Sequence, residues 1–184
     1  MGRPREFDAD TALDGAMNVF WRQGFKATNL PDLLTAMGLT RGSFYKAFGD
    51  KESVYLQALD RYDRTTISAG VEMLETCELD TASACLSQLF AGAKDARRGC
   101  FLCNAIVELA PDHPKVADKA RLMTDRLRGA IQSVLTRHGM AAPGQSTADL
   151  ILHLYFGHQA LGKAGKSRDD WHGHLAMLLG NAEA

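Results

Sequence analysis

The sequence lacks the long apolar run that a membrane-spanning helix needs. Such a helix takes about 20 consecutive apolar residues, and no stretch of the 184 residues approaches that length. The first residues, Met-Gly-Arg-Pro-Arg-Glu, also contain no apolar signal segment. We therefore expect a cytoplasmic protein with no membrane partner.

A second absence is an excess of charge of either sign. The formal net charge is −1, and residues 1–60 carry seven Lys or Arg against eight Asp or Glu. This balance excludes a strongly basic chain that would bind nucleic acid through its overall field. Any binding to phosphate has to depend on where individual cations are placed.

A third absence is alternation of apolar and polar residues at the period of a β-strand, since the apolar residues recur at helical spacing instead. The chain is 46% hydrophobic and long enough to bury a full core. We therefore predict an all-α fold of about nine helices. The expected helices begin near Asp8, Thr28 or Asn29, Thr40, Asp50 (reaching about Cys77), Thr81 (to Ala96), Phe101 (to Leu109), Lys115 (to His138), Ser146 and Ser167.

Cysteine is scarce, and no secretory signal accompanies it, so we expect thiols and no structural disulfides at the four positions. These are Cys77, Cys85, Cys100 and Cys103. Neither these cysteines nor the six histidines have the spacing of a metal site: His153 and His158, five apart, lie about 140° apart around a helix. We expect no metal and no cofactor.

Residues 28–51 form the stretch around which the chain is organised. Two short helical patterns are separated by Gly38, and each starts with a residue that can cap a helix, Thr28 or Asn29 for the first and Thr40 for the second. In the second pattern the aromatic residues at i and i+4 point inward and leave a polar outer face. The pattern indicates a helix-turn-helix, preceded by a first helix from Asp8.

The outer face of the second pattern carries groups suited to DNA. Arg41 has the geometry to bind a guanine edge, Ser43 a base or phosphate, and Tyr45, Lys46 and Lys51 phosphates. Gly42 disfavours a helix interior by about 1 kcal/mol, which close approach of the backbone to a base edge would offset. A plain α-hairpin with a solvated face is the alternative.

At these residues the chain resembles the TetR family of transcriptional regulators. The matching elements lie between Asp8 and Tyr62 and are Gly24-Phe25, Thr28, the run from Gly42 to Phe48, and Lys51-Glu52. The resemblance implies that Thr28, Tyr45 and Lys51 contact phosphates and that residues 41–43 read bases. It also implies a DNA-binding head, residues 1–49, and a helical body for effector binding and dimerisation, residues 50–184.

Residues 2–7 precede the first helix and resemble a basic arm. Arg3 and Arg5 flank Pro4, which disfavours helix, and such arms bind the minor groove of DNA. A solvated terminus that happens to be basic is the alternative.

The body offers candidates for an effector site and for a dimer interface. Cys100-Phe101-Leu102-Cys103 opens a helix beside Arg97 and Arg98, which together with the helix dipole would lower the Cys100 pKa. The effector or redox candidates are Cys100, Cys103, Met73, Phe101, His153, Phe156 and His158. The last two helices, which the resemblance places at a dimer interface, offer Leu154, Leu161, Trp171 and Leu175. Ordinary core packing would produce both patterns.

We therefore expect a homodimeric, non-enzymatic repressor that leaves a palindromic double-stranded DNA operator when a small-molecule or thiol-reactive effector binds. The alternative is a thiol-dependent redox enzyme that uses Cys100 and Cys103, although no strand is predicted before this motif.

Overall fold

The computed structural model describes residues 7–91, 98–140, 146–165 and 171–180, and within these ranges it is helical and contains no strand. Three consecutive segments, α4 (Lys51–Tyr62), the π-helical η1 (Asp63–Ile67) and α5 (Ser68–Glu75), form one continuous helix. With those three joined, the described residues form nine helices, which confirms the all-α prediction. The others are α1 (Ala9–Gln23), α2 (Leu30–Met37), α3 (Arg41–Phe48), α6 (Ala82–Ala91), α7 (Phe101–Glu108), α8 (Pro114–Arg137), α9 (Ser146–Lys163) and α10 (Trp171–Leu179).

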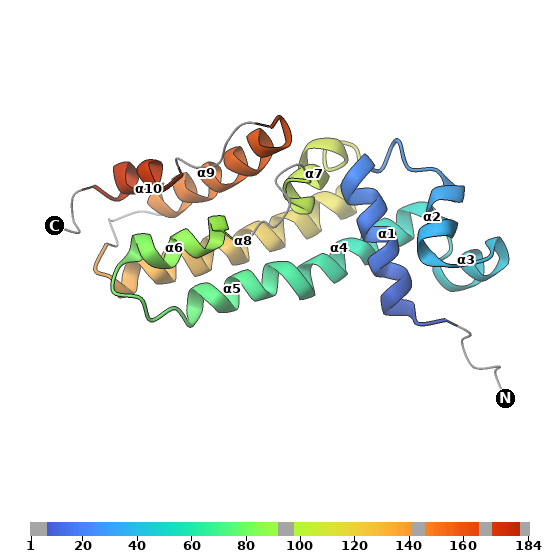
Figure 1. Ribbon diagram of the computed structural model, residues 1–184, viewed down its shortest axis with the longest axis horizontal. Helices are drawn as coiled ribbons and strands as arrows, with labels where there is room; N and C mark the ends of the chain where they lie inside the picture. The colour runs from blue at the N-terminus through green and yellow to red at the C-terminus, as the bar shows by residue number, and fades with distance from the viewer. Residues whose placement is uncertain (1–6, 92–97, 141–145, 166–170, 181–184) are drawn as a thin grey trace.

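Helices α1, α2 and α3 form the head at one end of the molecule (Figure 1). Each begins with a side chain that accepts a backbone N–H of its first turn: Asp8 for α1, Asn29 for α2 and Thr40 for α3. Between α2 and α3 the chain turns at Gly38, which has φ +64°. The local caps predicted from sequence are therefore present.

The first helix packs closely on the second. A Cβ added at Gly15 of α1 would lie 2.1 Å from the carbonyl oxygen of Ala36 in α2, a distance that no real Cβ contact shows. The buried rings of Phe20, Phe44 and Phe48 fill the space between these helices and α4. The helix-turn-helix is thus held by backbone contact as well as by apolar burial.

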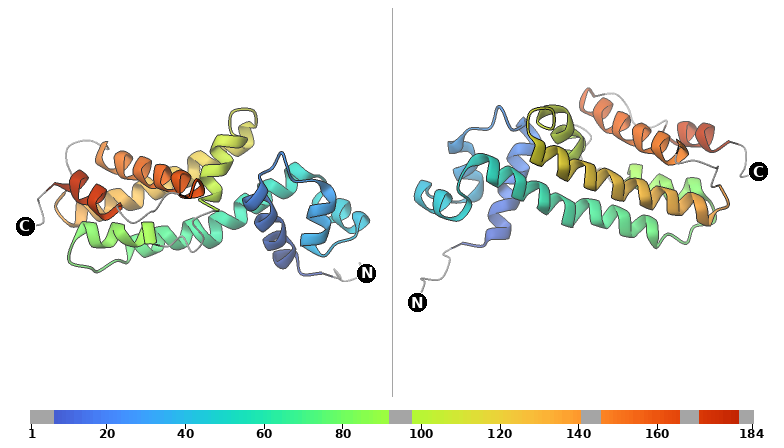
Figure 2. Two further views of the ribbon diagram at one scale, coloured as in Figure 1. Left: turned by 45° about the horizontal axis from the view of Figure 1, so that its top comes forward. Right: turned by 180° about the vertical axis from the view of Figure 1, so that it is seen from behind.

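The long helix from α4 to α5 joins the head to the body and runs along α8 (Figures 1 and 2). Its Arg61 forms ion pairs with Asp14 and Asp10 of α1, and Arg126 of α8 binds Asp63 of the π segment. Helix α9 packs on α8 and ends beside α7, where Lys163 donates to Asn104, and α10 packs on α6 at the pole opposite the head. The body is therefore a helical bundle that contacts the head through the long helix and through α7.

One expectation about the cysteines is wrong. Cys77 and Cys85 form a disulfide, with their Cα atoms 5.8 Å apart, whereas Cys100 and Cys103 are free thiols. The chain reverses between α5 and α6, which brings two residues that are eight positions apart side by side. Such a reversal is a tertiary feature that cysteine spacing cannot reveal.

Two other predictions fall on residues outside the described ranges, namely Arg3 and Arg5 of the arm and the Ser167 cap. Among the described residues, no helix is long and apolar enough to span a bilayer.

Candidate nucleic-acid interface and internal cavity

The outer face of α3 is polar and open. Arg41, Gly42, Tyr45 and Lys46 are exposed, Tyr45 by 49%, while Phe44 on the opposite face is buried. The Tyr45 ring makes an edge-to-face contact with the Phe44 ring, with ring centroids 5.5 Å apart. Four neighbouring residues therefore present a guanidinium, a bare backbone, a phenol and an ammonium on one surface.

Gly42 is the second residue of α3, so it lies in the first turn and not in the helix interior as predicted. A Cβ added there would meet nothing within 4 Å. Packing therefore does not require glycine at this position. The neighbouring Ser43 is half-buried, and its hydroxyl accepts a hydrogen bond from the Thr40 hydroxyl at 3.1 Å.

Two residues predicted to contact phosphates, Thr28 and Lys51, do not lie on the open face of α3. The Thr28 side chain is 1% exposed and donates to the Gly24 carbonyl at 2.5 Å, which leaves it turned into the head. Lys51 lies over the Phe25 ring, 4.4 Å from its centroid, and its burial lowers its pKa. A side-chain phosphate contact by Thr28 is therefore not supported, and Lys51 is partly engaged within the head.

Helix α7 connects the body to the head through its last residue. The Glu108 carboxylate accepts hydrogen bonds from the backbone N–H groups of Phe25, at 2.9 Å, and Lys26, at 2.7 Å. A Cβ added at Gly24, which has φ +82°, would lie 2.8 Å from the same carboxylate. The loop between α1 and α2 is thus held by the side chain of a body residue. This residue, Glu108, follows Cys100 by eight positions in the sequence.

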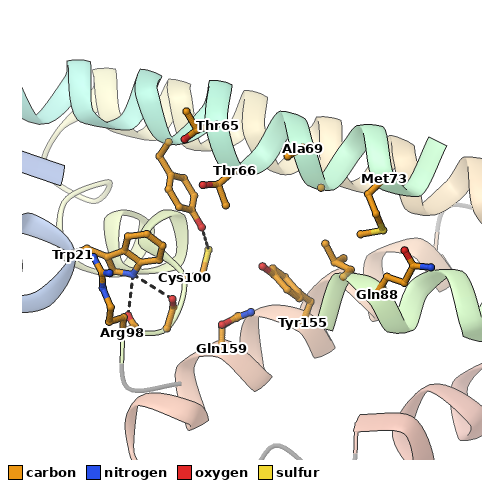
Figure 3. Close-up of a pocket in the computed structure, with 14 residues that line it drawn as sticks. Trp21, Thr65, Thr66, Ala69, Met73, Gln88, Arg98, Cys100, Tyr155 and Gln159 are labelled. Atoms are coloured by element: carbon orange, nitrogen blue, oxygen red, sulfur yellow. Dashed lines mark hydrogen bonds between the residues drawn. The ribbon is translucent and has the colours of Figure 1, made fainter. Parts of the chain in front are cut away.

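The body contains a cavity of about 550 Å³ between the long helix, α6, α9 and the start of α7. The π-helical segment η1 of the long helix supplies Thr65 and Thr66 to the cavity wall, and π turns often occur at functional sites. Figure 3 shows Met73 and Gln88 at one end and Trp21, Arg98 and Gln159 at the other. The lining residues also include Tyr62, Leu89, Cys100 and Tyr155.

Cys100 is at the wall of this cavity, but the prediction of a lowered pKa is wrong. The thiol is 2% exposed, and burial raises its pKa, although hydrogen bonding to the Tyr62 hydroxyl at 3.4 Å works in the opposite direction. Arg98 does not face the thiol as predicted, because its guanidinium lies 4.3 Å over the Trp21 ring. Arg97 lies outside the described residues. Cys103 is half-buried, and its pKa is raised mainly by burial.

The other effector candidates are spread over the body. Met73 lines the cavity, and Cys103 lines a smaller one of about 380 Å³ that shares Cys100 and Gln159. Phe101 is fully buried and packs on Trp21 and Tyr62 beside the cavity. The three candidates on α9 line neither cavity. His153 is exposed, Phe156 is half-buried, and the His158 ring packs against the Phe90 ring with centroids 5.7 Å apart.

Sequence reasoning missed Trp21, Tyr62, Tyr155 and Gln159, which line the cavity. The sequence signal that could have identified them is a side chain with a hydroxyl or amide group on an otherwise apolar helix face. On α9, Tyr155 and Gln159 follow Ile151 and Leu152 at helical spacing and are buried with them.

Helices α9 and α10 each carry exposed apolar side chains, which we call the apolar stripe. Leu150, Leu161 and Met177 are 50%, 55% and 80% exposed, and Leu154 and Gly157 lie on the same face of α9. Leu175, in contrast, is fully buried within this chain, and Trp171 is half-buried and stacked on Phe90 at 5.4 Å. The prediction that Leu175 is available to a dimer partner is therefore wrong.

A capped three-helix head with an open, polar second helix of a helix-turn-helix, joined to a helical body with a cavity, is an architecture typical of DNA-binding proteins. A family model described as bacterial regulatory proteins, tetR family, matches residues 12–58. The head of the chain therefore matches the TetR family.

Similar proteins span both the head and the body. The transcriptional repressor ComR of Escherichia coli is 37% identical over 124 residues, which cover 64% of this chain and 58% of ComR, so the match spans less than two thirds of that relative. The uncharacterised regulator YezE of Bacillus subtilis is 29% identical over 143 residues, 74% of this chain and 73% of YezE. A cysteine-substituted TetR family regulator, CifR, solved with 26-base-pair operator DNA, is 26% identical, with a TM-score of 0.80 over 99% of this chain and 100% of CifR.

Proposed function

We propose that this protein is a cytoplasmic DNA-binding transcriptional repressor whose head binds a duplex operator through α3. The observation that carries the proposal is the open face of α3, where Arg41, Gly42, Tyr45 and Lys46 are exposed and no packing need explains the glycine. The similarity to ComR, a repressor, and to CifR, which was solved on operator DNA, supports it. In this arrangement Arg41 and the Gly42 backbone approach base edges, while Tyr45 and Lys46 contact phosphates.

Residues 1–49 act as the DNA-binding domain and residues 50–184 as the effector-binding and dimerisation domain. The cavity at Cys100 receives a small molecule, and occupancy releases the operator through α7 and its Glu108 contact with the head. A thiol that is buried and has a raised pKa is a poor nucleophile. The cavity therefore favours a non-covalent effector over a thiol-reactive one, and binding over thiol catalysis.

Two copies pair through the exposed stripe of α9 and α10. Leu150, Leu161 and Met177 would be covered by the same residues of the partner, as a two-fold interface requires. Pairing would place two α3 helices on a palindromic site with half-sites one or more helical turns apart.

The operator contact is tested with Gly42→Ala and Tyr45→Phe, using an operator selected from a random duplex pool. Because a Cβ at position 42 meets open space, Gly42→Ala should leave the free energy of unfolding unchanged or raise it. It should nevertheless weaken operator binding at least tenfold, and Tyr45→Phe should weaken binding to all sequences alike. Affinities equal to wild type for both variants at one fixed salt concentration would remove α3 from the interface.

The dimer is tested with Met177→Glu, which places a charge at the most exposed apolar side chain of the stripe. Sedimentation equilibrium should give a dimer for wild type and a much weaker one for the variant. Leu122→Glu on α8 is the matched control, because Leu122 is 66% exposed and lies on another helix. Equal dissociation of both variants, or a wild-type monomer at micromolar concentration, contradicts the assignment.

A further inference from the structure

The cavity is lined by apolar and polar side chains. Met73 of α5 and Gln88 of α6 lie at one end, and Arg98 and Gln159 lie at the other, beside the Trp21 ring (Figure 3); Leu89 of α6 is also part of the lining. A molecule that fills about 550 Å³ here meets apolar side chains such as Met73 and polar ones along its length, and the two buried polar atoms of the lining without partners among the described residues belong to Arg98 and Gln159.

Gln159 supplies an acceptor at the end beside the Trp21 ring. Its side chain is 2% exposed, and its Oε1 atom is buried and has no hydrogen-bond partner in the part of the chain that the structure describes. A buried amide oxygen left without a donor is destabilising, so such atoms are nearly always paired in folded proteins. An occupant of the cavity that donates a hydrogen bond to Gln159 would remove that cost.

Arg98 supplies a donor at the same end. One terminal nitrogen donates to the Asn18 side chain at 2.8 Å, and the guanidinium plane lies over Trp21, but the buried Nε atom has no hydrogen-bond partner among the described residues. The guanidinium is therefore already fixed by two contacts, and its Nε–H group still lacks an acceptor among the described residues.

A hydroxyl group has both functions, since its oxygen donates one hydrogen bond and accepts others. A carboxylate accepts only, so it would pair with Arg98 but leave the Gln159 oxygen facing another acceptor. An ether also accepts only. An ammonium donates only and would face the guanidinium charge.

We propose that the cavity binds a neutral, hydroxyl-bearing and otherwise apolar small molecule, with its hydroxyl at Gln159 and Arg98 and its apolar part toward Met73 and Leu89. Only the statement that this molecule is the effector rests on the proposed function. The binding itself is measured without DNA, so failure of the operator assay and failure of this proposal are distinguishable.

The test uses three probes with one ring system: 2-naphthol, 2-methoxynaphthalene and 2-naphthoate. They carry a hydroxyl, an ether and a carboxylate. Dissociation constants are measured on the full chain by titration calorimetry or by naphthalene fluorescence. We expect 2-naphthol to bind about tenfold more tightly than either of the others, the loss that one unpaired buried group causes.

Gln159→Met is the matched variant, because it keeps the length of the side chain and removes the acceptor. It should remove most of the preference for 2-naphthol over 2-methoxynaphthalene, and the thermal unfolding of the variant reports whether it folds. Equal affinities of the three probes for wild type would overturn the proposal, as would tightest binding of 2-naphthoate or no binding of any probe. Retention of the full preference by folded Gln159→Met would also contradict it.

Discussion

The head and the body of this molecule differ in how their polar groups are used. In the head, Asp8, Asn29 and Thr40 cap the helix that each precedes, so their partners lie two or three residues away. In the body, Arg98 and Gln159 line a cavity whose walls come from distant parts of the chain, and each has a buried polar atom without a partner among the described residues. The head is therefore built to be a fixed shape with an open polar face, and the body keeps interior groups available for an occupant.

Gly15 and Gly42 of the head offer the sharpest way to separate folding from binding. Gly15→Ala should lower the free energy of unfolding by about 3 kcal/mol, because the new Cβ would lie 2.1 Å from a backbone oxygen of α2. Gly42→Ala, with open space around its Cβ, is the control that should not be destabilised. Urea denaturation measures both, and equal stability of the two variants would contradict the packing described for α1 on α2.

The disulfide should stabilise the body and leave the head unaffected. Closing a loop between Cys77 and Cys85 corresponds to about 2.5 kcal/mol in the chain-entropy description. Cys77→Ser with Cys85→Ser should therefore lower the free energy of unfolding by about that amount. Operator affinity should stay within a factor of two, and a large loss of affinity would show that this distant end of the body affects the head.

Glu108 is the point where the two regions meet. Glu108→Ala removes the acceptor of two backbone N–H groups, so we expect a loss of about 2 kcal/mol, and about half of that for Glu108→Gln, which keeps one oxygen. Glu75→Ala, at an exposed position of α5, is the control and should change stability by less than about 0.5 kcal/mol. A loss no larger for Glu108→Ala than for Glu75→Ala would remove this link between α7 and the head.

The smallest expected effect concerns the reactivity of Cys100. Because burial raises its pKa, the thiolate is scarcer at pH 7.5 than for a free cysteine, and its reaction with iodoacetamide should accelerate only as the pH rises toward that raised pKa. We expect labelling of native Cys100 to be at least tenfold slower than in the urea-unfolded chain, and slower than that of half-buried Cys103. Peptide mass spectrometry separates the two sites, and faster labelling of Cys100 than of Cys103 would restore a reactive-thiol sensor.

The differences between regions also explain what could be predicted from sequence. Helix caps, the turn at Gly38 and the inward Phe44 and Phe48 depend on neighbours within a few residues, so local pattern predicted them. The burial of Thr28, the position of Lys51 over Phe25 and the disulfide depend on how helices pack, and single-sequence spacing carries no information on that packing. The cavity was predicted only in part, through Met73 and Cys100, because its walls combine α1, the long helix, α6, α9 and the start of α7.

The most direct test of the central claim is the salt dependence of duplex operator binding. Fluorescence anisotropy gives the affinity of wild type and of Lys46→Gln over a range of salt concentrations. The account predicts a steep fall of affinity with salt for wild type, and a slope smaller by about 1 for each protomer in Lys46→Gln, because one phosphate contact is lost. Arg64→Gln, an exposed position of the π segment in the body, should keep the wild-type slope. A flat salt dependence of the wild type, or the same slope for Lys46→Gln as for wild type, would contradict the claim that α3 binds DNA.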